Sequence, residues 1–379
     1  PERITIRRAL GLLGFSKTEI GIVSMAGPLA VAISTIPMGI LADLRGRKRI
    51  LLSARHLFAM SDLMFFFHTD LTRLFLANFL GGLASSMNMA SRSPLLADKT
   101  HGRERSRAFT FSFVLFSTGS VLGCLLAGLP DIMKAYYGLT LVEAVRWLFA
   151  ICSFFAFTSF LLILPVGEEK VRRKISKMVI RSWGPLAKFC FFQALIASGA
   201  GLIVPWFSYY FFVKFGVEFS ELGLLFALTQ ALMALGYLSA LRLSRRLGDV
   251  RTAVACQIAS LFMLLAIPFS SSFLMASVFY VVRAVLMNMA SPILRSFFLG
   301  LLERGERASA NAVKNTAWMV FRSLGIYGSG YVMEIYSMET PFFISFLLYL
   351  MASVLLYMFF GREKPSPGVE APPPAGVMG

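Results

Sequence analysis

The residues with the clearest potential for charge chemistry lie in one short stretch, residues 39–49, which reads GILADLRGRKR. Asp43 stands four residues before Arg47, so the two can form an ion pair, and the carboxylate can also neutralise the positive N-terminus of a neighbouring helix. Gly39 and Gly46 allow two helix ends to approach closely and the chain to turn sharply. This chemistry is electrostatic rather than catalytic.

No catalytic or metal-binding signature accompanies this stretch. The sequence has no GxxxxGK phosphate loop, no HExxH and no GxSxG, so it offers no basis for ATP hydrolysis, zinc protease or serine hydrolase chemistry. Its four cysteines stand apart from one another, without a CxxC pair, and are expected to pack as apolar residues. We therefore predict no enzyme activity, no cofactor, no disulfide scaffold and no metal site.

The composition is that of a protein whose solvent is a lipid bilayer. Of 379 residues, 57% are apolar and only 15% are charged, whereas soluble domains are about a quarter charged. A membrane-spanning helix needs about 20 apolar residues. Eleven such stretches occur, at 20–42, 50–68, 72–97, 107–129, 144–165, 187–212, 221–243, 251–270, 272–300, 309–333 and 340–360. The prediction is an all-α polytopic membrane protein.

The distribution of the basic residues predicts orientation and excludes one partner. A net charge of +17 would suit nucleic acid if the bases formed one surface. They instead occupy alternate short loops between apolar stretches, which the positive-inside rule places in the cytoplasm. We expect no nucleic-acid partner and an integral protein of a prokaryotic plasma membrane, with the basic loops and the C-terminal tail cytoplasmic and residues 1–19 outside.

The chain also contains an internal repeat. Residues 14–21, GFSKTEIG, align with residues 216–223, GVEFSELG. Further glycines recur in the same register: Gly46 with Gly248, Gly123 with Gly325, and Gly128 with Gly330. Such a repeat predicts two similar helical bundles. The stretch 187–212 projects onto positions before residue 11, so we infer that its partner, a first helix, is missing; a genuine eleven-helix protein is the alternative.

The repeat and the loops divide the chain into four predicted parts. These are an N-terminal helical bundle at 1–165, a basic cytoplasmic linker at 166–186, a C-terminal helical bundle at 187–360 and a disordered cytoplasmic tail at 361–379. Apolar and basic residues recur with helical spacing in the linker, which suits a helix lying on the inner leaflet. A flexible basic linker is the other interpretation.

Residues 39–49 resemble, at every defining position, the loop signature G-x-L-a-D-r-x-G-r-k of the major facilitator superfamily. A degenerate second copy, RRLGDVR, occupies residues 245–251. The resemblance implies the major facilitator fold, two pseudo-symmetric six-helix bundles with 11 of 12 helices present in this chain. It also implies that Gly39, Asp43, Gly46 and Arg47 belong to a conformational switch, with Asp98 as the acidic partner from the fourth helix.

Two departures from the family patterns bear on the type of transport. Asn78 stands where many proton-coupled members of the family have an arginine, and Cys124 replaces the proline of the fifth-helix antiporter pattern. The resemblance to drug–proton antiporters is therefore weakened.

Polar side chains inside the apolar stretches are the candidate solute and coupling sites, because a charge in hydrocarbon costs roughly 2.5–3.5 kcal/mol. Asp62 is the embedded acid and the candidate coupling residue. Five embedded bases outnumber it: Arg92, Arg283, Arg295, Lys314 and Arg322. This imbalance favours an anionic solute. The candidates for substrate binding, each also able to bridge helices, are Arg283, Asn78, Asn88, Gln193, Gln230 and Arg322.

These features together predict a secondary active transporter that moves a small solute by alternating access. The predicted coupling ion is the proton, in symport or antiport, and the predicted solute is an organic anion or an amphipathic drug-like compound. We expect a monomer in the lipid bilayer. The alternative is a non-transporting membrane sensor or assembly subunit that uses the same bundle, and flux across a reconstituted bilayer separates the two.

Overall fold

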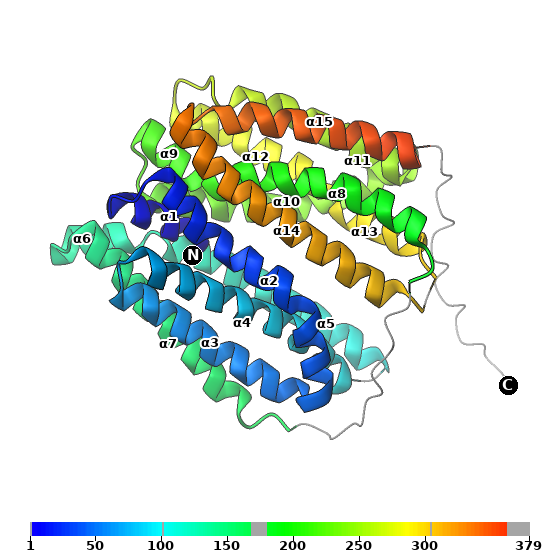
Figure 1. The fold of residues 1–379 in the computed structure, drawn as a ribbon, viewed down its shortest axis with the longest axis horizontal. Coiled ribbons are helices and arrows are strands. Elements are labelled where there is room, and N and C mark those ends of the chain that lie inside the picture. The colour runs from blue at the N-terminus through cyan, green and yellow to red at the C-terminus, as the bar shows by residue number, and fades with distance from the viewer. Residues whose placement is uncertain (1, 101, 168–179, 304, 362–379) are drawn as a thin grey trace.

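The computed structural model describes residues 2–100, 102–167, 180–303 and 305–361 (Figure 1). Within these ranges the chain forms α-helices and one 3-10 helix, and no strand. The first half contains α1 (Glu2–Leu12), α2 (Lys17–Arg45), α3 (Arg47–Phe67), α4 (Leu71–Asp98), α5 (Gly102–Leu126), α6 (Leu129–Tyr137) and α7 (Leu141–Ile163). The predicted all-α fold is confirmed.

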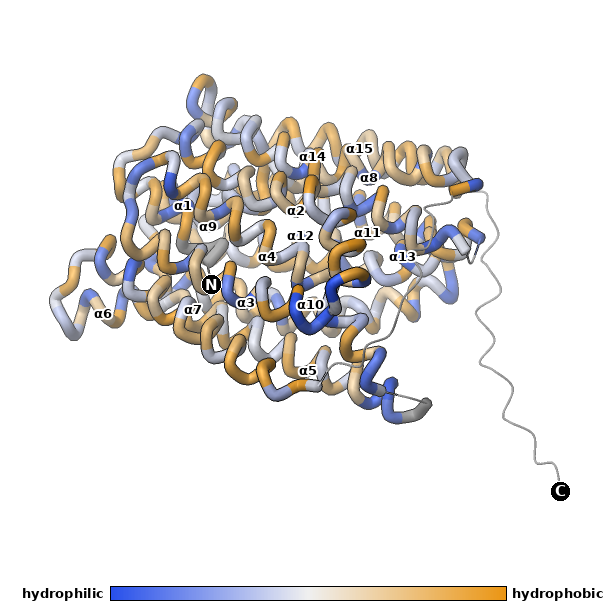
Figure 2. Tube along the Cα trace, turned by 60° about the horizontal axis from the view of Figure 1, so that its bottom comes forward, coloured by the Kyte–Doolittle hydropathy of each residue, from blue (hydrophilic) through white to orange (hydrophobic). Residues whose placement is uncertain are grey.

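The second half begins after the linker. It contains α8 (Trp183–Ile203), η1 (Val204–Trp206), α9 (Phe207–Phe215), α10 (Phe219–Leu247), α11 (Asp249–Ala266), α12 (Phe273–Met289), α13 (Ser291–Gly300), α14 (Arg307–Ile335) and α15 (Thr340–Phe360). Nine of the described helical segments are long and apolar enough to cross a membrane. Hydrophilic residues gather towards the helix ends and loops (Figure 2).

The repeat seen in the sequence recurs in the helix boundaries. In its register, α2 and α10 begin and end at equivalent positions, and α3 and α11 begin at equivalent positions. α4 has the same relation to the pair α12 and α13 taken together, and the start of α1 is equivalent to the start of η1. The helices α2 and α10 both end at a glycine with positive φ, Gly46 at 101° and Gly248 at 85°, a conformation that glycine adopts readily.

The helices differ from the predicted stretches mainly where a span is interrupted. The stretch 272–300 is divided at Ala290 into α12 and α13, next to Pro292, which has no N–H to continue the helix. The stretch 187–212 is divided in the same way by η1, which contains Pro205. Residues 1–19, in which no spanning stretch was predicted, include α1, and α8 begins inside the predicted linker. The rest of that linker and the tail fall largely outside the described residues.

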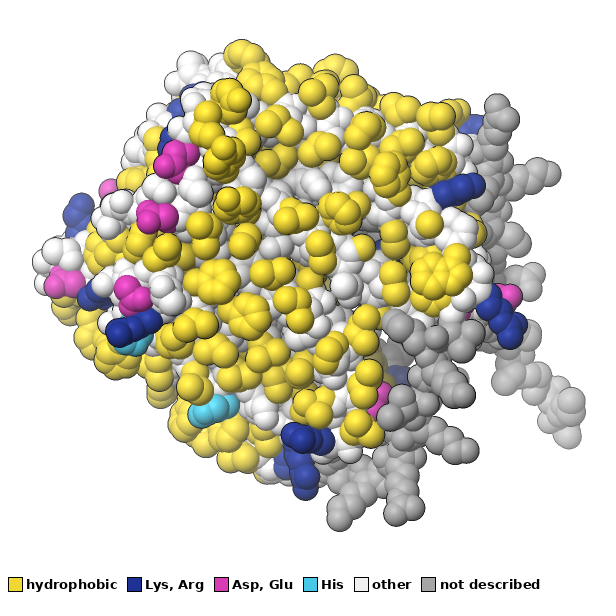
Figure 3. Space-filling view, viewed as in Figure 1, with side chains coloured by type: hydrophobic (Ala, Val, Ile, Leu, Met, Phe, Trp, Pro, Cys, Tyr) yellow, Lys and Arg dark blue, Asp and Glu magenta, His cyan; other side chains and the backbone are white. Residues whose placement is uncertain are grey.

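The helix ends form two opposite ends of the molecule. We define the contact end as the end that carries residues 13–16, 127–140, 216–218 and 336–339. We define the basic end as the end that carries residues 45–47, 98–100, 247–249 and 301–303. On the face shown in Figure 3, hydrophobic side chains cover the middle and charged side chains lie towards the two ends. This distribution suits a belt of lipid around the middle.

Glu306 connects the end of the linker to α14. One of its carboxylate oxygens, Oε2, accepts the N–H groups of Arg181 (2.6 Å) and Ser182 (3.0 Å), and its Oε1 accepts the Glu303 N–H (3.2 Å). Hydrogen bonds from Ser182, followed by that from Arg181, lower the pKa of Glu306 from 4.5 to about 2. The charged carboxylate therefore ties the start of α8 to the loop before α14.

We expect Glu306→Gln to lower the unfolding temperature at neutral pH, because an amide accepts more weakly than a carboxylate. The pKa of Glu306 is lower in the folded protein than in the unfolded chain. Its stabilisation is therefore fully present above pH 4.5 and is lost as the pH falls towards about 2. Thermal unfolding of both proteins across this range should show the difference shrinking with acidification.

The matched control is Glu303→Gln. Glu303 is on the same loop, but its ion pair with Arg181 is long, 3.9 Å, and its side chain is exposed. The control should leave the unfolding temperature nearly unchanged. An equal effect of the two variants at neutral pH would contradict the role given to Glu306.

Candidate functional site

Two pairs of helices join the halves of the molecule: α2 packs on α14, and α5 packs on α10. Both pairs approach closely through glycine at the contact end. A Cβ added at Gly330 would lie 2.3 Å from the Lys17 carbonyl oxygen, and one added at Gly223 would lie 2.6 Å from that of Cys124. Larger residues at these positions would push the halves apart, so the contact end is closed by direct backbone packing.

Carboxylates reinforce this closure at equivalent places in the two halves. Glu334 Oε2 on α14 accepts the N–H of Thr18, the second residue of α2, at 2.8 Å. Asp131 Oδ2 on α6 accepts the N–H of Ser220, the second residue of α10, at 2.6 Å. Thr18 and Ser220 occupy equivalent positions of the internal repeat. Both N-termini also have a capping box of their own, so each half supplies an anion to one further N–H group at a helix N-terminus of the other half.

α1 adds a third connection at the contact end. Arg7 Nη1 donates to the Pro205 carbonyl oxygen at 2.6 Å, and the Arg8 guanidinium lies over the rings of Phe212 and Phe219, 4.1 and 3.8 Å from their centroids. Both arginines are buried. The structure thus places both arginines between α1 and the second half.

Towards the basic end, the faces of α2 and α10 that make these contacts are no longer covered by the other half. Gly21 of α2 contacts α14, and Gly39 lies five turns of about 3.6 residues further along, hence on the same face. A Cβ at Gly39 would have no atom within 4 Å. On α10, the position five turns beyond Gly223 is Leu241, which is 52% exposed. Both interfaces are therefore closed at the contact end and open at the basic end.

The predicted conformational switch is located at the basic end. Gly46 makes the turn between α2 and α3, and Arg47, the first residue of α3, binds carboxylates from two helices. Its Nη2 lies 3.0 Å from Asp43 Oδ1, and its Nη1 lies 3.0 and 3.1 Å from the two oxygens of Asp98. Four of the five predicted residues thus meet, and Gly39 lies one turn before Asp43 on α2.

The candidate polar residues of the first half bridge helices. Asn78 Nδ2 on α4 donates to the Val23 carbonyl oxygen of α2 at 2.6 Å. Asn88 Oδ1 accepts from Arg55 Nη2 of α3 at 3.0 Å. Asp62, also on α3, is 3% exposed.

The candidates of the second half are spread over four helices. Arg283 of α12 is 3% exposed, and its Nη2 donates to the Tyr349 hydroxyl at 3.1 Å, with the Phe207 and Tyr349 rings around it. Arg322 is half-buried on α14, and Gln193 is half-buried on α8. Gln230 Nε2 on α10 donates to Ser120 Oγ of α5 at 3.3 Å, so it connects the halves. The structure therefore gathers the switch residues but distributes the candidate solute residues.

Comparison with known proteins identifies the family. The sequence profile of the Major Facilitator Superfamily matches residues 6–188 and, a second time, residues 189–377. The chain belongs to the major facilitator superfamily. The two matches correspond to the two halves described above. They indicate a transporter rather than an enzyme.

One sequence relative and two solved structures match nearly the whole of this superfamily member at low identity. An uncharacterised MFS-type transporter of Methanocaldococcus jannaschii is 23% identical over 359 residues, 92% of this chain and 91% of that protein. A bacterial homologue of the human lysosomal transporter Spinster, in an inward-facing and occupied conformation, has a TM-score of 0.79 at 13% identity, over 97% of this chain and 94% of that one. A D-xylose–proton symporter has a TM-score of 0.74 at 12% identity, over 94% and 92%.

The carboxylates of the contact end can be tested by removing their charge. In a variant with Asp131→Asn and Glu334→Gln, we expect the population open at the contact end to rise about threefold to tenfold, because a neutral amide accepts a hydrogen bond more weakly than a carboxylate does. The measurement is the labelling rate of Ile326→Cys, a buried position beside Gly21, by a membrane-impermeant maleimide, in a background without the native cysteines.

Asp70→Asn provides the control. Asp70 is also at the contact end, but it accepts the Arg73 N–H within its own half. This variant should label at the parent rate. Equal labelling of the double variant and the parent would show that the two carboxylates do not hold the halves together.

Proposed function

We propose that this superfamily member is a secondary active transporter that carries a small solute by alternating access. The observation that supports this best is the pair of glycines on one face of α2, Gly21 packed against α14 and Gly39 facing open space. A helix with a glycine near each end of one face can contact α14 at either end. Closing at the basic end and opening at the contact end would expose the space between the halves to the other side of the membrane.

The switch residues suit closure at the basic end. The beginning of α14 is built from small residues, Ala308, Ser309 and Ala310, which would admit the α2 backbone at Gly39. Asp43 would then approach the positive N-terminus of α14, as the Glu334 carboxylate does at the N-terminus of α2. In the present conformation Arg47 holds Asp43 and Asp98 instead.

The charges inside the predicted spans favour a small organic anion as solute, with Arg283 and Arg322 as its cationic contacts and Asn78, Asn88, Gln193 and Gln230 as hydrogen-bonding partners. Because the side chains of α9, α12 and α15 enclose Arg283, a solute would reach it after these rearrange. Asp62 is the proposed proton-coupling residue, since a buried carboxyl group gains and loses its proton with large changes in solvation.

The proposed orientation places the basic end in the cytoplasm and the contact end outside, according to the positive-inside rule. In this orientation the structure is open to the cytoplasm. We further propose a monomer in a prokaryotic plasma membrane, with the division of the chain into two bundles, a linker and a tail as the sequence predicts.

A bulky side chain at Gly39 should stop the cycle without harming the fold. A Cβ at Gly39 has no atom within 4 Å, so we expect the unfolding temperature of Gly39→Leu to stay near the parent value. Closure at the basic end would be overpacked by roughly 1–3 kcal/mol, so uptake should fall about tenfold or more. The measurement is uptake of radiolabelled organic anions into proteoliposomes under a proton gradient, together with thermal unfolding.

The control for this variant is Ile40→Phe. It adds comparable bulk one residue further along α2 on a different face, where Ile40 is already 44% exposed. Uptake should then remain near the parent rate. Parent-level uptake by Gly39→Leu would overturn the proposed closure between α2 and α14.

Removal of the buried guanidinium tests the solute class. We expect Arg283→Ala to reduce uptake of organic anions about tenfold or more, because a charged hydrogen bond contributes roughly 1.5–3 kcal/mol. Tyr349→Phe keeps the ring and removes only the hydroxyl, and should retain most anion uptake. Unchanged anion uptake by Arg283→Ala would remove Arg283 from the binding site.

A further inference from the structure

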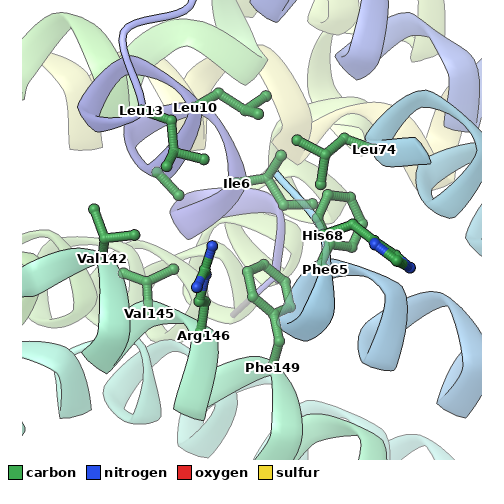
Figure 4. A pocket seen from close by; sticks show the side chains of 11 residues that line it. Ile6, Leu10, Leu13, Phe65, His68, Leu74, Val142, Val145, Arg146 and Phe149 are labelled. Carbon is green, nitrogen blue, oxygen red and sulfur yellow. The ribbon is translucent and has the colours of Figure 1, made fainter. Parts of the chain in front are cut away.

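An apolar hollow lies among α1, α3, α4 and α7 at the contact end (Figure 4). Its free space of about 20 Å³ holds about one water molecule, and its arginine, Arg146, interacts electrostatically with Glu143. This hollow therefore has neither the volume nor the unbalanced charge that a solute site needs. Unbalanced positive charge is found instead nearer the basic end, between α3 and α4.

Two arginines, Arg55 of α3 and Arg92 of α4, form what we call the arginine pair. Arg55 Nη2 donates to Asn88 Oδ1 at 3.0 Å. Arg92 stands four residues after Asn88 on α4, so the two side chains share one helix face and the Arg55 guanidinium is held close to Arg92. The positive charge of Arg92 acts on Arg55. Arg92 Nη2 donates to Ser112 Oγ of α5 at 3.1 Å.

Neither member of the pair has a carboxylate partner among the residues that the structure describes. The hydrogen bonds to Asn88 and Ser112 end on neutral oxygens, and each arginine uses only its Nη2 for them. Arg55 Nε is buried without an acceptor. Like charges inside a membrane span raise the free energy of the protein unless a counter-charge is bound. The described part of the chain does not supply the two negative charges that would balance this pair.

The second half builds the equivalent place without charge. In the register of the repeat, Arg55, Asn88 and Arg92 correspond to Gln257, Ala290 and Leu294. Leu294 is 6% exposed and belongs to the hydrophobic core, and Gln257 Oε1 accepts from Ser353 Oγ at 3.0 Å. Equivalent helices thus pack at this position without an arginine. The charge of the pair is therefore not a requirement of packing, which favours a role in binding.

The arginine pair is accessible from one side. Both arginines are half-buried, whereas Met89 of α4 and Phe116 of α5, next to Arg92, are 54% and 59% exposed. The Phe116 ring lies under the Arg92 guanidinium, with its centroid 5.3 Å away. A ring in this position covers a face of the guanidinium and leaves its N–H edges available. A ligand can therefore reach these edges.

We propose that the arginine pair binds a doubly charged oxyanion, the phosphoryl group of inorganic phosphate or of a phosphate monoester. Guanidinium groups offer N–H donors in a geometry that matches phosphate oxygens, and two negative charges balance the two positive ones. A singly charged carboxylate would leave one of them unbalanced. Asn88 and Ser112 position the two guanidinium groups. Asn88 is also a proposed solute contact, but binding at the pair does not require transport.

Binding is measured without flux, by equilibrium dialysis of radiolabelled inorganic phosphate against the purified full-length protein in detergent. We expect saturable binding at neutral pH and constant ionic strength. Sulfate, which carries two negative charges, should displace the phosphate at concentrations about tenfold or more below those needed for methyl sulfate, which carries one. Equal displacement by the two competitors would contradict a site for a dianion.

Two variants take the residues of the second half, Arg55→Gln and Arg92→Leu. Each should weaken phosphate binding about tenfold or more. Without phosphate, neither variant should unfold at a lower temperature than the parent, because each relieves the repulsion between like charges. Undiminished binding in both variants would overturn the proposal, and so would a loss of binding accompanied by a fall in the unfolding temperature.

Arg295→Gln is the matched control. Arg295 is an exposed base of α13, towards the basic end of the second half and outside the arginine pair, and this variant should bind phosphate as the parent does. A loss equal to that of Arg92→Leu would show that overall positive charge attracts the phosphate, against the proposal. Phosphatidic acid in phosphatidylcholine nanodiscs tests the source of the phosphoryl group: displacement of bound phosphate would assign the site to a lipid headgroup, and retention would assign it to a ligand from water.

Discussion

The backbone N–H groups at the start of a helix need acceptors, and in this transporter two of them find acceptors on the opposite half of the molecule. Glu334 serves α2 and Asp131 serves α10, at positions related by the internal repeat. Because these carboxylates and the glycine contacts lie at one end, they fix the halves there and leave the other end apart. The end at which the two halves are fixed decides where α2 and α10 are uncovered. It also decides whether the switch residues and the candidate solute residues lie at the open or the closed end.

The two halves repeat the helices but not the charges. Asp43 and Arg47 form the pair at the joint of α2 and α3, whereas the equivalent positions are Arg245 and Asp249, with the acid and the base exchanged. In the second copy Ser244 Oγ bonds Asp249. The third member, Asp98, has Gly300 as its counterpart. One arginine therefore connects three helices, α2, α3 and α4, in the first half, and its equivalent position in the second half is an aspartate. The two halves thus carry different charges at equivalent positions of one pseudo-symmetric fold.

Much of this structure follows from the sequence, because hydrophobic length and local motifs act over short distances. Apolar stretches locate the spanning helices, and the signature at 39–49 leads to the ion pairs of Arg47 with Asp43 and Asp98. The breaks at Pro205 and after Ala290 were missed, since a proline within an apolar run looks like part of one helix. The roles of Arg8, Asp131 and Glu334 could not be read at all, because they depend on which helices of the two halves meet.

The most direct test of alternating access measures both ends of one protein. Spin labels at Leu44→Cys and Leu247→Cys report the distance between the halves at the basic end, and labels at Thr69→Cys and Tyr336→Cys report it at the contact end. The account predicts two populations, in which the basic-end distance shortens when the contact-end distance lengthens. A single fixed distance for both pairs, or distances that change together, would contradict it.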